Sequence, residues 1–459
     1  MIFENGRVSD VKIAYIGGGS RGWAWGLMAD LALAEDLSGQ VNLYDIDREA
    51  AQHNEEIGNN INGGNTQWRY KAVDSLKEAL TGANFVVISI LPGTFDEMES
   101  DVHTPEKFGI YQSVGDTFGP GGLVRALRCI PMFEEIALAV KEFCPEAWVI
   151  NYTNPMTLSV AALYRAFPEI KAFGCCHEVF GTQKMLASAL EEFAGIEGVE
   201  REEIKINVLA VNHFTWITKA QYKGMDVFPI YRQFAEKYKD IGNDTRKIAG
   251  GLKCFQNYNK VKIDLFLRYG VMAAAGDRHL AEFCPGDWYL KSPEQVDEWM
   301  FGLTPVSWRK ADLKDRLESS MKFRTGEDTI KLRPTGEEGV RQIRAILGLE
   351  DLCTNVNMPN RGQIPNLPLG AVVETNAVFT SDSVTPSFAG SVPKSIMPLV
   401  APVVTEQEMV LEAAFCRDLD MAFSAFATDP LVRLSLSDTR KLFDEMIANT
   451  SNYLGMYRK

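Results

Sequence analysis

The sequence predicts an α/β protein, with a Rossmann-type parallel sheet in its N-terminal part and an α+β region after it. Two observations support this prediction. Short runs of β-branched and apolar residues alternate with helical stretches over the first third of the chain, which is typical of a parallel sheet with crossover helices. The length of 459 residues also exceeds what one ordinary hydrophobic core supports, so two closely packed domains are expected.

The strands expected in the first third are apolar almost throughout. This composition fits strands that are buried on both faces of a sheet. The expected strands are Val11–Ile16, Val41–Tyr44, Phe85–Ile90, Trp148–Ile150 and Ala172–Cys175.

After residue 200 the pattern becomes mixed, and the stretch INVLAVNHFTWI is expected to be the opening strand of a second domain. We therefore expect domains at residues 1–200 and 201–459. Residues 369–379 return to a strand pattern. Helices are expected from Thr405 to Tyr457, with Thr405 and Ser437 as candidate N-caps.

The chain is acidic, with a formal net charge of -14. It has no basic footprint, so neither nucleic acid nor an anionic membrane surface is expected as a partner. The first residues lack the pattern of a signal peptide, and no apolar run is long enough to span a bilayer. The 8 cysteines follow no disulfide or zinc-finger spacing, so reduced thiols and a cytoplasmic location are expected.

A glycine-rich turn follows the first of the expected strands. Gly17, Gly19 and Gly22 satisfy the pattern G-x-G-x-x-G, and Ser20 and Arg21 lie between the last two. Glycine suits such a turn because the backbone must approach a pyrophosphate closely, and the next helix presents free N–H groups to the anion. The turn therefore predicts a dinucleotide site.

The next strand ends in LYDID, which places Asp45 and Asp47 at its carboxyl end. An acidic side chain there binds the ribose diol and repels a 2′-phosphate, so the sequence predicts NAD rather than NADP. Asp45 is the stronger candidate, because Asp47 could instead cap the following helix. A strand–turn–helix without a nucleotide is the alternative interpretation of the whole motif.

Five short segments place polar residues beside expected strands and helices. Loops at the carboxyl ends of parallel strands are where α/β sheets bind their ligands, so these segments are expected to converge. They are GDTFGPGG (115–122), NYTNP (151–155), GCCHEVFG (174–181), VNHFTWI (211–217) and AAAGDRHLAEF (273–283).

These motifs resemble glycoside hydrolase family four over essentially the whole chain. The resemblance rests on the glycine-rich start, the Asn-Pro after a strand, the Cys-His pair at Cys176 and the Val-Asn-His at His213. At subfamily level it is strongest for the α-galacturonidase branch, through GIYQSVGDTFGPGG, INYTNPM, GCCHEVFGTQK and NHFTWITKA. This family departs from the two-carboxylate scheme of ordinary glycosidases. The resemblance implies NAD and a divalent metal, usually manganese, as cofactors.

The resemblance assigns the metal to Cys176 and His213. Residue chemistry agrees, because a deprotonated thiol and a neutral imidazole suit a transition metal such as Mn²⁺. Neighbouring residues of an extended segment point to opposite sides, so Cys176 and His177 are not expected to face one metal, and His177 is expected on the cofactor side or behind a ligand. The alternative is that Cys175 and Cys176 are a buried pair and that His213 is a core histidine.

The implied reaction is redox-neutral. NAD⁺ takes a hydride from carbon 3 of the sugar, a base removes the acidified proton of carbon 2, and the aglycone leaves with the help of an acid. Water then adds and the hydride returns. Net accumulation of NADH is therefore not expected.

The acid position of the family corresponds to Asp116. A raised pKa is expected for it, because Val114 and Phe118 offer an apolar setting. The base is expected at Asp277, where a nearby cation would keep the carboxylate ionised. The structural alternatives are a helix cap for Asp116 and an ion pair with Arg278 for Asp277.

The segment after FVVISI reads LPGTFDEMESD and lacks the arginine that phospho-sugar members carry there, so a sugar phosphate is not expected. The predicted substrate is a uronic-acid glycoside, specifically an α-galacturonide. Asn151 and Asn154 resemble the substrate-contacting asparagines of the family. Either Arg278 or Arg361 could pair with the substrate carboxylate.

Other functions stay open at this point. An NAD-dependent hydroxy-acid dehydrogenase would share the Rossmann start and the expected plan of lactate and malate dehydrogenases, but it would use a His–Asp pair instead of a metal. A non-catalytic NAD sensor would keep the glycine-rich turn without the residues for chemistry. An NAD-dependent glycosidase for another α-hexoside is the nearest alternative, and we expect a homo-oligomer.

Overall fold

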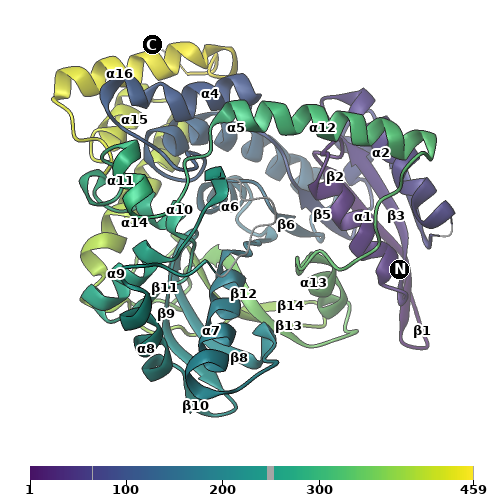
Figure 1. Ribbon diagram of the computed structural model, residues 1–459. Coiled ribbons are helices and arrows are strands. Elements are labelled where there is room, and N and C mark those ends of the chain that lie inside the picture. The colour runs from purple at the N-terminus through teal and green to yellow at the C-terminus, as the bar shows by residue number, and fades with distance from the viewer. Residues whose placement is uncertain (65, 245–252, 458–459) are drawn as a thin grey trace.

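The computed structural model describes residues 1–64, 66–244 and 253–457, and Figure 1 shows a large central sheet. This sheet has ten strands in the order β14-β13-β12-β7-β6-β5-β2-β3-β4, with β1 added beside β2. The strands are β1 (Ile2–Glu4), β2 (Arg7–Ile16), β3 (Leu37–Tyr44), β4 (Trp68–Ala72), β5 (Phe85–Ile88), β6 (Trp148–Asn151), β7 (Lys171–Gly174), β12 (Leu352–Pro359), β13 (Val372–Thr380) and β14 (Ser383–Pro386).

Strands β2 to β7 are parallel to one another and lie in the spatial order β4-β3-β2-β5-β6-β7. Counted along the chain, this is the 3-2-1-4-5-6 order of the Rossmann fold, so the predicted fold class is confirmed. All the expected parallel strands are present, whereas β1 and β4 were not expected. The strand order reverses between β2 and β5, and the crevice at the carboxyl ends of these strands is where such sheets bind ligands.

The apolar side chains of β2 alternate between the two faces of the sheet. Ile13 and Tyr15 pack in one hydrophobic cluster, together with side chains of α1 (Trp23–Leu33) and α13 (Gly339–Ile346). Ala14 and Ile16 pack in the other cluster, which includes side chains of α5 (Gly119–Phe143) and α6 (Met156–Ala166). The prediction of strands that are buried on both faces is therefore confirmed.

The chain returns to this sheet near its end. β12 pairs antiparallel with β7, and β13 and β14 extend the edge, each antiparallel to its neighbour. The strand expected at 369–379 is confirmed as β13, but its place in the N-terminal sheet was not expected. The domain boundary at residue 200 stays a prediction.

A smaller four-stranded sheet follows the first Rossmann segment. The stretch INVLAVNHFTWI, expected as one strand, is a hairpin in which Val211 pairs with Phe214 across a two-residue turn. Apolar residues continue on both sides of Asn212 and His213, so periodicity alone gave no sign of the break. Side chains of α7, α8 and α9 pack against this sheet. The elements are β8 (Ile204–Val211), β9 (Phe214–Tyr222), β10 (Met225–Asp226), β11 (Met272–Ala273), α7 (Glu178–Ala194), α8 (Phe228–Tyr238) and α9 (Lys260–Tyr269).

The C-terminal part is helical as predicted, but both expected N-caps are wrong. Thr405 lies within α14, where its hydroxyl donates to the carbonyl of Ala401 at 3.0 Å. Ser437 lies inside α16, whose N-cap is Ser435, because the Ser435 hydroxyl accepts from the N–H of Asp438. The remaining helices are α2 (Arg48–Asn60), α3 (Leu76–Leu80), α4 (Phe95–His103), α10 (Asp277–Glu282), α11 (Pro293–Glu298), α12 (Val306–Thr325), α14 (Met397–Cys416), α15 (Leu419–Phe426) and α16 (Leu436–Asn449).

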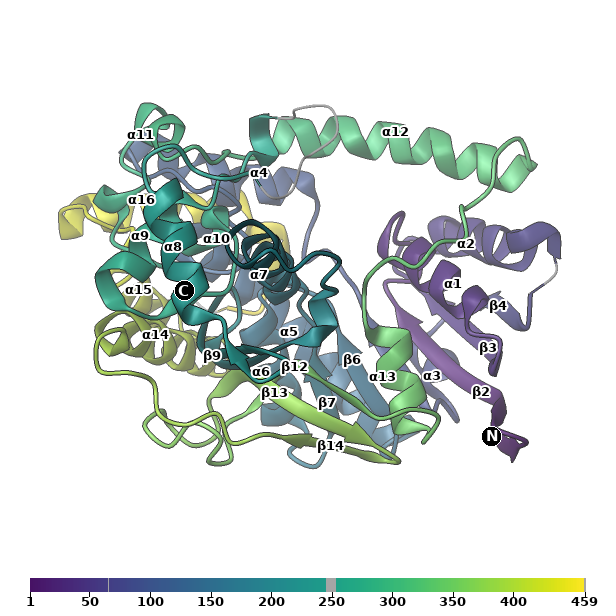
Figure 2. The same cartoon turned by 60° about the horizontal axis from the view of Figure 1, so that its bottom comes forward.

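The long helix α12 runs along the top of the molecule in Figure 2, from the neighbourhood of α4 to that of α2. Lys310 pairs with Asp96 of α4 at 2.6 Å, and Arg324 pairs with Glu56 of α2 at 2.7 Å. Exposed ion pairs of this kind each contribute little to the free energy of unfolding, so their main effect is to orient α12. No helix in the described ranges combines the length and the apolar character needed to cross a membrane.

Candidate functional site

The turn between β2 and α1 is packed so closely that side chains are excluded from it. A Cβ added at Gly17 would lie 2.0 Å from the carbonyl oxygen of Ser89, and one added at Gly19 would lie 2.6 Å from the Cβ of Ala50. Gly17 also has a φ of +90°, which favours glycine. Helix α1 begins directly after Gly22, so its free N–H groups lie at the turn. This geometry fits the close approach of a dinucleotide phosphate.

Ser20 and Arg21 complete the turn. The N–H of Ser20 donates to the carbonyl of Gly17 at 3.0 Å. The carbonyl of Arg21 accepts from Nη1 of Arg316 at 2.7 Å, and a Cβ added at Gly22 would lie 2.2 Å from the same nitrogen. Because Arg316 belongs to α12, this helix contacts the glycine-rich turn directly.

Asp45 braces the turn from the end of β3. Its Oδ2 accepts from the N–H of Gly19 at 2.8 Å, and its Oδ1 accepts from the N–H of Asp47 at 2.9 Å. Each oxygen keeps a second lone pair that can accept from a ribose hydroxyl. Burial raises the pKa of Asp45, although the two backbone hydrogen bonds oppose this rise. Asp47 caps α2 by accepting from the N–H of Ala50 at 3.1 Å, which is the structural alternative considered for it.

A cavity of about 350 Å³ lies beside this turn, against α1 and the start of α13. Trp23 and Tyr152 line it, with ring centroids 5.1 Å apart. His177 stacks on Trp23 with the ring centroids 6.3 Å apart, and its Nδ1 lies 2.8 Å from Oε1 of Glu337. His177 therefore lies beside the glycine-rich turn, on the cofactor side of the site.

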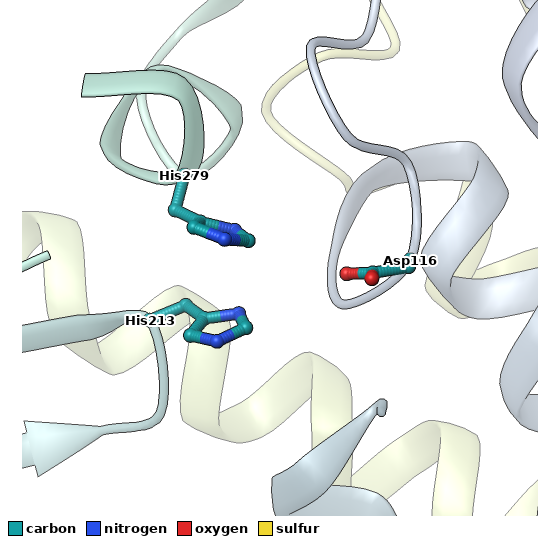
Figure 3. Close-up of side chains that lie close together, drawn as sticks. All are labelled: Asp116, His213 and His279. Carbon is teal, nitrogen blue, oxygen red and sulfur yellow. The ribbon is translucent and has the colours of Figure 1, made fainter. Parts of the chain in front are cut away.

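Asp116, His213 and His279 come together at a second place, shown in Figure 3. Each offers one ligand atom, and these atoms all lie within 4.8 Å of one another. The two imidazole ring centroids are 3.8 Å apart. The three side chains come from the loop before α5, the turn between β8 and β9, and α10. One carboxylate and two imidazoles suit a divalent transition metal.

Thr117 determines which nitrogen of His213 is available. Its hydroxyl donates to Oδ1 of Asp116 at 2.7 Å and lies 2.9 Å from Nδ1 of His213. A hydroxyl has one hydrogen, which here goes to the carboxylate, so Nδ1 of His213 must be the donor in the second bond. Nε2 of the neutral ring then carries the lone pair. This is the tautomer that a metal ligand requires, with its other nitrogen held by a second partner.

The hairpin presents His213 at a cost in backbone energy. His213 has a φ of 61° and Ala210, three residues earlier, has a φ of 102°. Residues other than glycine rarely adopt such left-handed conformations, and they persist where the surrounding structure enforces them. Strain of this kind is concentrated at functional sites, which agrees with a ligand role for His213.

The charges around Asp116 set its protonation state. Burial alone would raise the pKa of Asp116, but three neighbours that carry or can take up a positive charge, together with the Thr117 hydroxyl, outweigh burial and lower this pKa to about 2. These neighbours are His279, Arg125 and His213. Burial lowers the pKa of both histidines, that of His279 to about 3, so Arg125 supplies the permanent positive charge at neutral pH. The raised pKa expected for Asp116 is therefore wrong.

Cys176 is not part of the group formed by Asp116 and the two histidines. Burial raises the pKa of its thiol, and the nearby carboxylates of Glu374 and Glu178 raise it further. A thiol must lose its proton to bind a metal, so this environment does not favour the thiolate. The assignment of Cys176 as a metal ligand stays a prediction.

Cys175 and Cys176 have different surroundings, as expected for neighbours in an extended segment. The thiol of Cys175 donates to Oε1 of Gln342 in α13 at 2.9 Å. Cys176 instead lies beside Asn212, the residue before His213. The amide of Asn212 donates to Oε2 of Glu374 at 3.0 Å, and burial raises the pKa of Glu374 to about 7. This buried network therefore joins Cys176 to the residue before His213.

The carboxylate of Asp277 is not part of the Asp116 group either. Its Oδ1 accepts from the N–H of Lys262 in the first turn of α9 at 3.0 Å, and its own N–H donates to Oδ1 of Asn257 at 3.2 Å. Asp277 thus satisfies an N–H group that helix α9 cannot satisfy itself. Its assignment as the catalytic base stays a prediction.

The guanidinium of Arg278 is hydrogen-bonded to other residues of the chain. Its Nε donates to the carbonyl of Gly302 at 3.2 Å, and its Nη2 donates to the carbonyl of Ser113 at 3.3 Å and to the hydroxyl of Thr304. The guanidinium also lies over the ring of Phe255, 5.0 Å from its centroid. These contacts connect α10 to the loop that carries Asp116.

Arg361 is exposed, and its guanidinium lies 6.0 Å from the ring centroid of Tyr164. The Tyr164 hydroxyl donates to the carbonyl of Ala172, near the amino end of β7. Because β12 runs antiparallel to β7, the loop after β12 lies at the amino ends of the parallel strands, opposite the site. The structure therefore does not bring Arg361 to the Asp116 group.

The two predicted asparagines have different surroundings. The amide of Asn151 is used in its own turn, where Oδ1 accepts from the N–H of Thr153 at 2.9 Å and Nδ2 donates to the carbonyl of Thr153 at 3.0 Å. Asn154 instead has a buried Oδ1 with no hydrogen-bond partner among the described residues. Its carbonyl accepts from Nε of Arg125 at 3.0 Å. Asn154 is therefore the better placed of the two to contact a ligand.

Three residues of this site had no predicted role. Arg125 lies in the stretch LVRALR, where a charge on a buried helix is itself a functional signal. His279 is one of only 5 histidines and lies in one of the polar segments. Thr117 carried no such signal, because its partner His213 is 96 residues away in the sequence.

The chain was compared with known proteins. Residues 12–192 match Family 4 glycosyl hydrolase, and residues 208–432 match the Family 4 glycosyl hydrolase C-terminal domain. An α-galacturonidase of Thermoanaerobacterium saccharolyticum is 62% identical over 458 residues, which are 99% of this chain and 98% of that protein. The crystal structure of lplD from Bacillus subtilis has a TM-score of 0.92 at 51% identity and covers 96% of this chain and 100% of that one.

A more distant solved structure shares the fold. It is a 6-phospho-α-glucosidase from gut microorganisms in complex with NAD and Mn²⁺, with a TM-score of 0.78 at 17% identity, covering 97% of this chain and 99% of that one. The two family matches together span most of the sequence, on both sides of residue 200, so the resemblance inferred from the motifs is confirmed. The chain is a glycoside hydrolase and belongs to family 4 of the glycosyl hydrolases.

Proposed function

We propose that this protein hydrolyses α-galacturonides, with NAD and a divalent metal, most suitably Mn²⁺, as its cofactors. The observation that carries the substrate class is the 62% identity to an α-galacturonidase over nearly the full length of both chains. The residues that the site brings together support the cofactors.

The glycine-rich turn fits NAD. Added Cβ atoms would collide with its surroundings, and the start of α1 supplies unpaired N–H groups for a pyrophosphate. The acidic residue at the end of β3 disfavours a 2′-phosphate. The residues that would hold NAD are Gly17, Gly19, Ser20, Arg21, Gly22 and Asp45.

The Asp116 group fits a divalent metal. His213 has its Nε2 lone pair available, and Nδ1 of His279 is buried without a hydrogen-bond partner in the described part of the chain. Asp116 is ionised at neutral pH because its pKa is lowered. His213 and His279 would hold the metal, with Cys176 as a further proposed ligand, and Asp116 would join them if it does not act as the acid. When bound, NAD supplies a reversible hydride acceptor and the metal supplies Lewis acidity.

The proton transfers are assigned to the carboxylates of the chain. We propose Asp116 as the acid at the leaving oxygen and Asp277 as the base at carbon 2. The lowered pKa of Asp116 makes a metal-ligand role the competing one. Asp116→Asn distinguishes the two roles. An acid is needed more by poor leaving groups than by nitrophenol, whereas a lost ligand lowers the metal content and slows all substrates alike.

The substrate is tested with a panel of 4-nitrophenyl α-glycosides. The protein is loaded with NAD⁺ and Mn²⁺ under a thiol reductant, and kcat/KM is measured for the galacturonide, galactoside, glucoside and their 6-phosphates. We expect the galacturonide to have the highest kcat/KM and no NADH to accumulate at 340 nm. A higher kcat/KM for a neutral or phosphorylated hexoside would contradict the substrate, and net NADH would indicate a dehydrogenase.

We also propose a cytoplasmic location and a homo-oligomer. All 8 cysteines are free thiols, which supports a reducing compartment. Light scattering of the purified protein tests the assembly. A mass of 51.1 kDa, that of one chain, would contradict the homo-oligomer.

A further inference from the structure

Arg125 is a buried cation that makes no direct ion pair with a carboxylate of the described residues. Its side chain lies in α5 and the residue is only 5% exposed. Its Nε donates to the carbonyl of Asn154 at 3.0 Å, but its Nη1 is buried and has no hydrogen-bond partner among the described residues. Asp116 and Asp101 lie near enough for their charges to act on Arg125, but neither occupies Nη1. A buried guanidinium is strongly disfavoured unless an anion compensates for its lost hydration.

The arginine one turn further along α5 shows what such compensation looks like. Arg128 is 1% exposed, and its Nη1 and Nη2 donate to the two oxygens of Asp101 at 3.0 and 2.5 Å. The same helix therefore contains one buried arginine that is hydrogen-bonded to a carboxylate and one that is not. The unused Nη1 of Arg125 is a local feature of its position, since the helix can accommodate a complete pair.

The position of Arg125 is next to the Asp116 group. It lies in α5, which begins three residues after Asp116. It also contacts the turn after β6, where Oδ1 of Asn154 is buried and has no hydrogen-bond partner among the described residues. An unpaired donor and an unpaired acceptor thus lie on neighbouring residues beside the candidate metal ligands. This combination matches a ligand that carries both an anionic group and hydroxyl groups.

The other two candidate arginines fit a substrate carboxylate less well. The guanidinium of Arg278 already donates to two carbonyls and one hydroxyl. Arg361 is exposed and lies at the amino ends of the parallel strands. Of the three, only Arg125 combines burial, an unused donor and contact with the site.

We propose that Arg125 is the residue that binds the carboxylate of the sugar acid and so determines the preference for a uronide over a neutral sugar. This inference rests on the proposed function and adds the residue that carries its specificity. In the complex, Nη1 of Arg125 donates to a carboxylate oxygen and Oδ1 of Asn154 accepts from a neighbouring hydroxyl. The carboxylate supplies the direct acceptor for Nη1 that the described residues do not provide.

The test compares two substrates on the full-length protein loaded with NAD⁺ and Mn²⁺. kcat/KM is measured for 4-nitrophenyl α-galacturonide and 4-nitrophenyl α-galactoside in the wild type, Arg125→Gln and Arg125→Lys. The matched control is Arg165→Gln, an exposed arginine of α6 that pairs with Glu412. A charge-assisted hydrogen bond of ordinary strength predicts that Arg125→Gln lowers the galacturonide-to-galactoside ratio roughly ten- to hundredfold. Arg125→Lys keeps the charge without the planar donor set, so its galacturonide-to-galactoside ratio should lie between those of the wild type and Arg125→Gln.

Two further measurements separate specificity from folding and from general catalysis. The dissociation constants of galacturonate and galactose, measured by calorimetry, should change only for galacturonate. A melting temperature of Arg125→Gln close to that of the wild type would show that the variant folds normally.

The outcomes distinguish this inference from the proposed function. If the wild type does not prefer the galacturonide, the proposed function fails and this inference fails with it. If the wild type prefers the galacturonide but Arg125→Gln slows both substrates by the same factor, only the role of Arg125 is overturned. A loss of NAD affinity in Arg125→Gln with an unchanged substrate ratio would assign the guanidinium to the cofactor and would also overturn it.

Discussion

The hydroxyl of Thr117 joins the carboxylate of Asp116 to the imidazole of His213, and its removal is a sharp perturbation of the site. Thr117→Val keeps the branched shape and removes one part-buried and one buried hydrogen bond, of 2.7 and 2.9 Å. The bond to the ionised carboxylate is worth about 1.5–3 kcal/mol and the other about 0.5–1.5 kcal/mol, so the free energy of unfolding should fall by about 2–4.5 kcal/mol. The pKa of Asp116 should rise, because the hydroxyl helps to lower it.

The larger consequence concerns the metal. Without Thr117 the His213 ring loses the partner that fixes its tautomer and orientation, and such partners are typically worth a ten- to hundredfold difference in metal affinity, or about 1.4–2.7 kcal/mol. Mn²⁺ affinity is measured by calorimetry on the NAD-loaded protein, and stability by urea unfolding. Thr117→Ser, which retains the hydroxyl, should behave like the wild type in both assays.

Two results would refute this reasoning. Unchanged Mn²⁺ affinity in Thr117→Val, with the stability loss present, would show that His213 does not depend on Thr117 as a ligand. Equal losses in Thr117→Ser and Thr117→Val would assign the effect to the methyl group rather than the hydroxyl. In either case the tautomer deduced for His213 would lose its support.

Further predictions concern other parts of the molecule. Gly19→Ala should weaken NAD binding at least tenfold in a fluorescence titration, since its Cβ would lie 2.6 Å from another Cβ; unchanged affinity would place NAD elsewhere. Asp277→Asn should stop exchange of the carbon 2 hydrogen in deuterated water, and normal exchange would exclude Asp277 as the base. Burial, with Asp429 beside it, raises the pKa of Glu406 well above its ordinary value of 4.5. The unfolded chain therefore releases this proton at lower pH than the folded chain does, and the wild type loses stability as pH rises. Glu406→Gln has no proton to lose, so its stability relative to wild type should grow by up to about 1.4 kcal/mol per pH unit above pH 5, and parallel pH profiles would contradict this. Chelation of the metal and removal of NAD should each abolish turnover, and activity should return when the missing cofactor is added back.

The local parts of the structure were predictable from the sequence. The parallel strands follow from apolar runs, the turn at Gly17 from backbone requirements, and the candidate ligand His213 from the resemblance of its segment to the family. Each of these signals lies within a few neighbouring residues. The hairpin turn at Asn212 was missed because apolar residues continue on both sides of it.

The non-local parts were not predictable. Nothing in the sequence around residue 352 reveals that β12 pairs with β7, since pairing partners of a strand are set by tertiary packing. The protonation of Asp116 depends on Arg125 and His279, which come from other elements. Burial of Asp116 tends to raise its pKa as expected, but the final pKa follows from the sum of burial and these charges.

The late strands β12 to β14 have a consequence for how the chain acquires its structure during synthesis. The ribosome makes β7 long before β12, so the edge of β7 emerges without its neighbour and stays unpaired until residues 352–359 have followed. An unpaired strand edge is a template for pairing with other chains. Nascent chains should therefore be most prone to aggregation, and most dependent on chaperones, between completion of β7 and arrival of β12. Fragments that stop at residue 200 should aggregate, whereas the full chain should not.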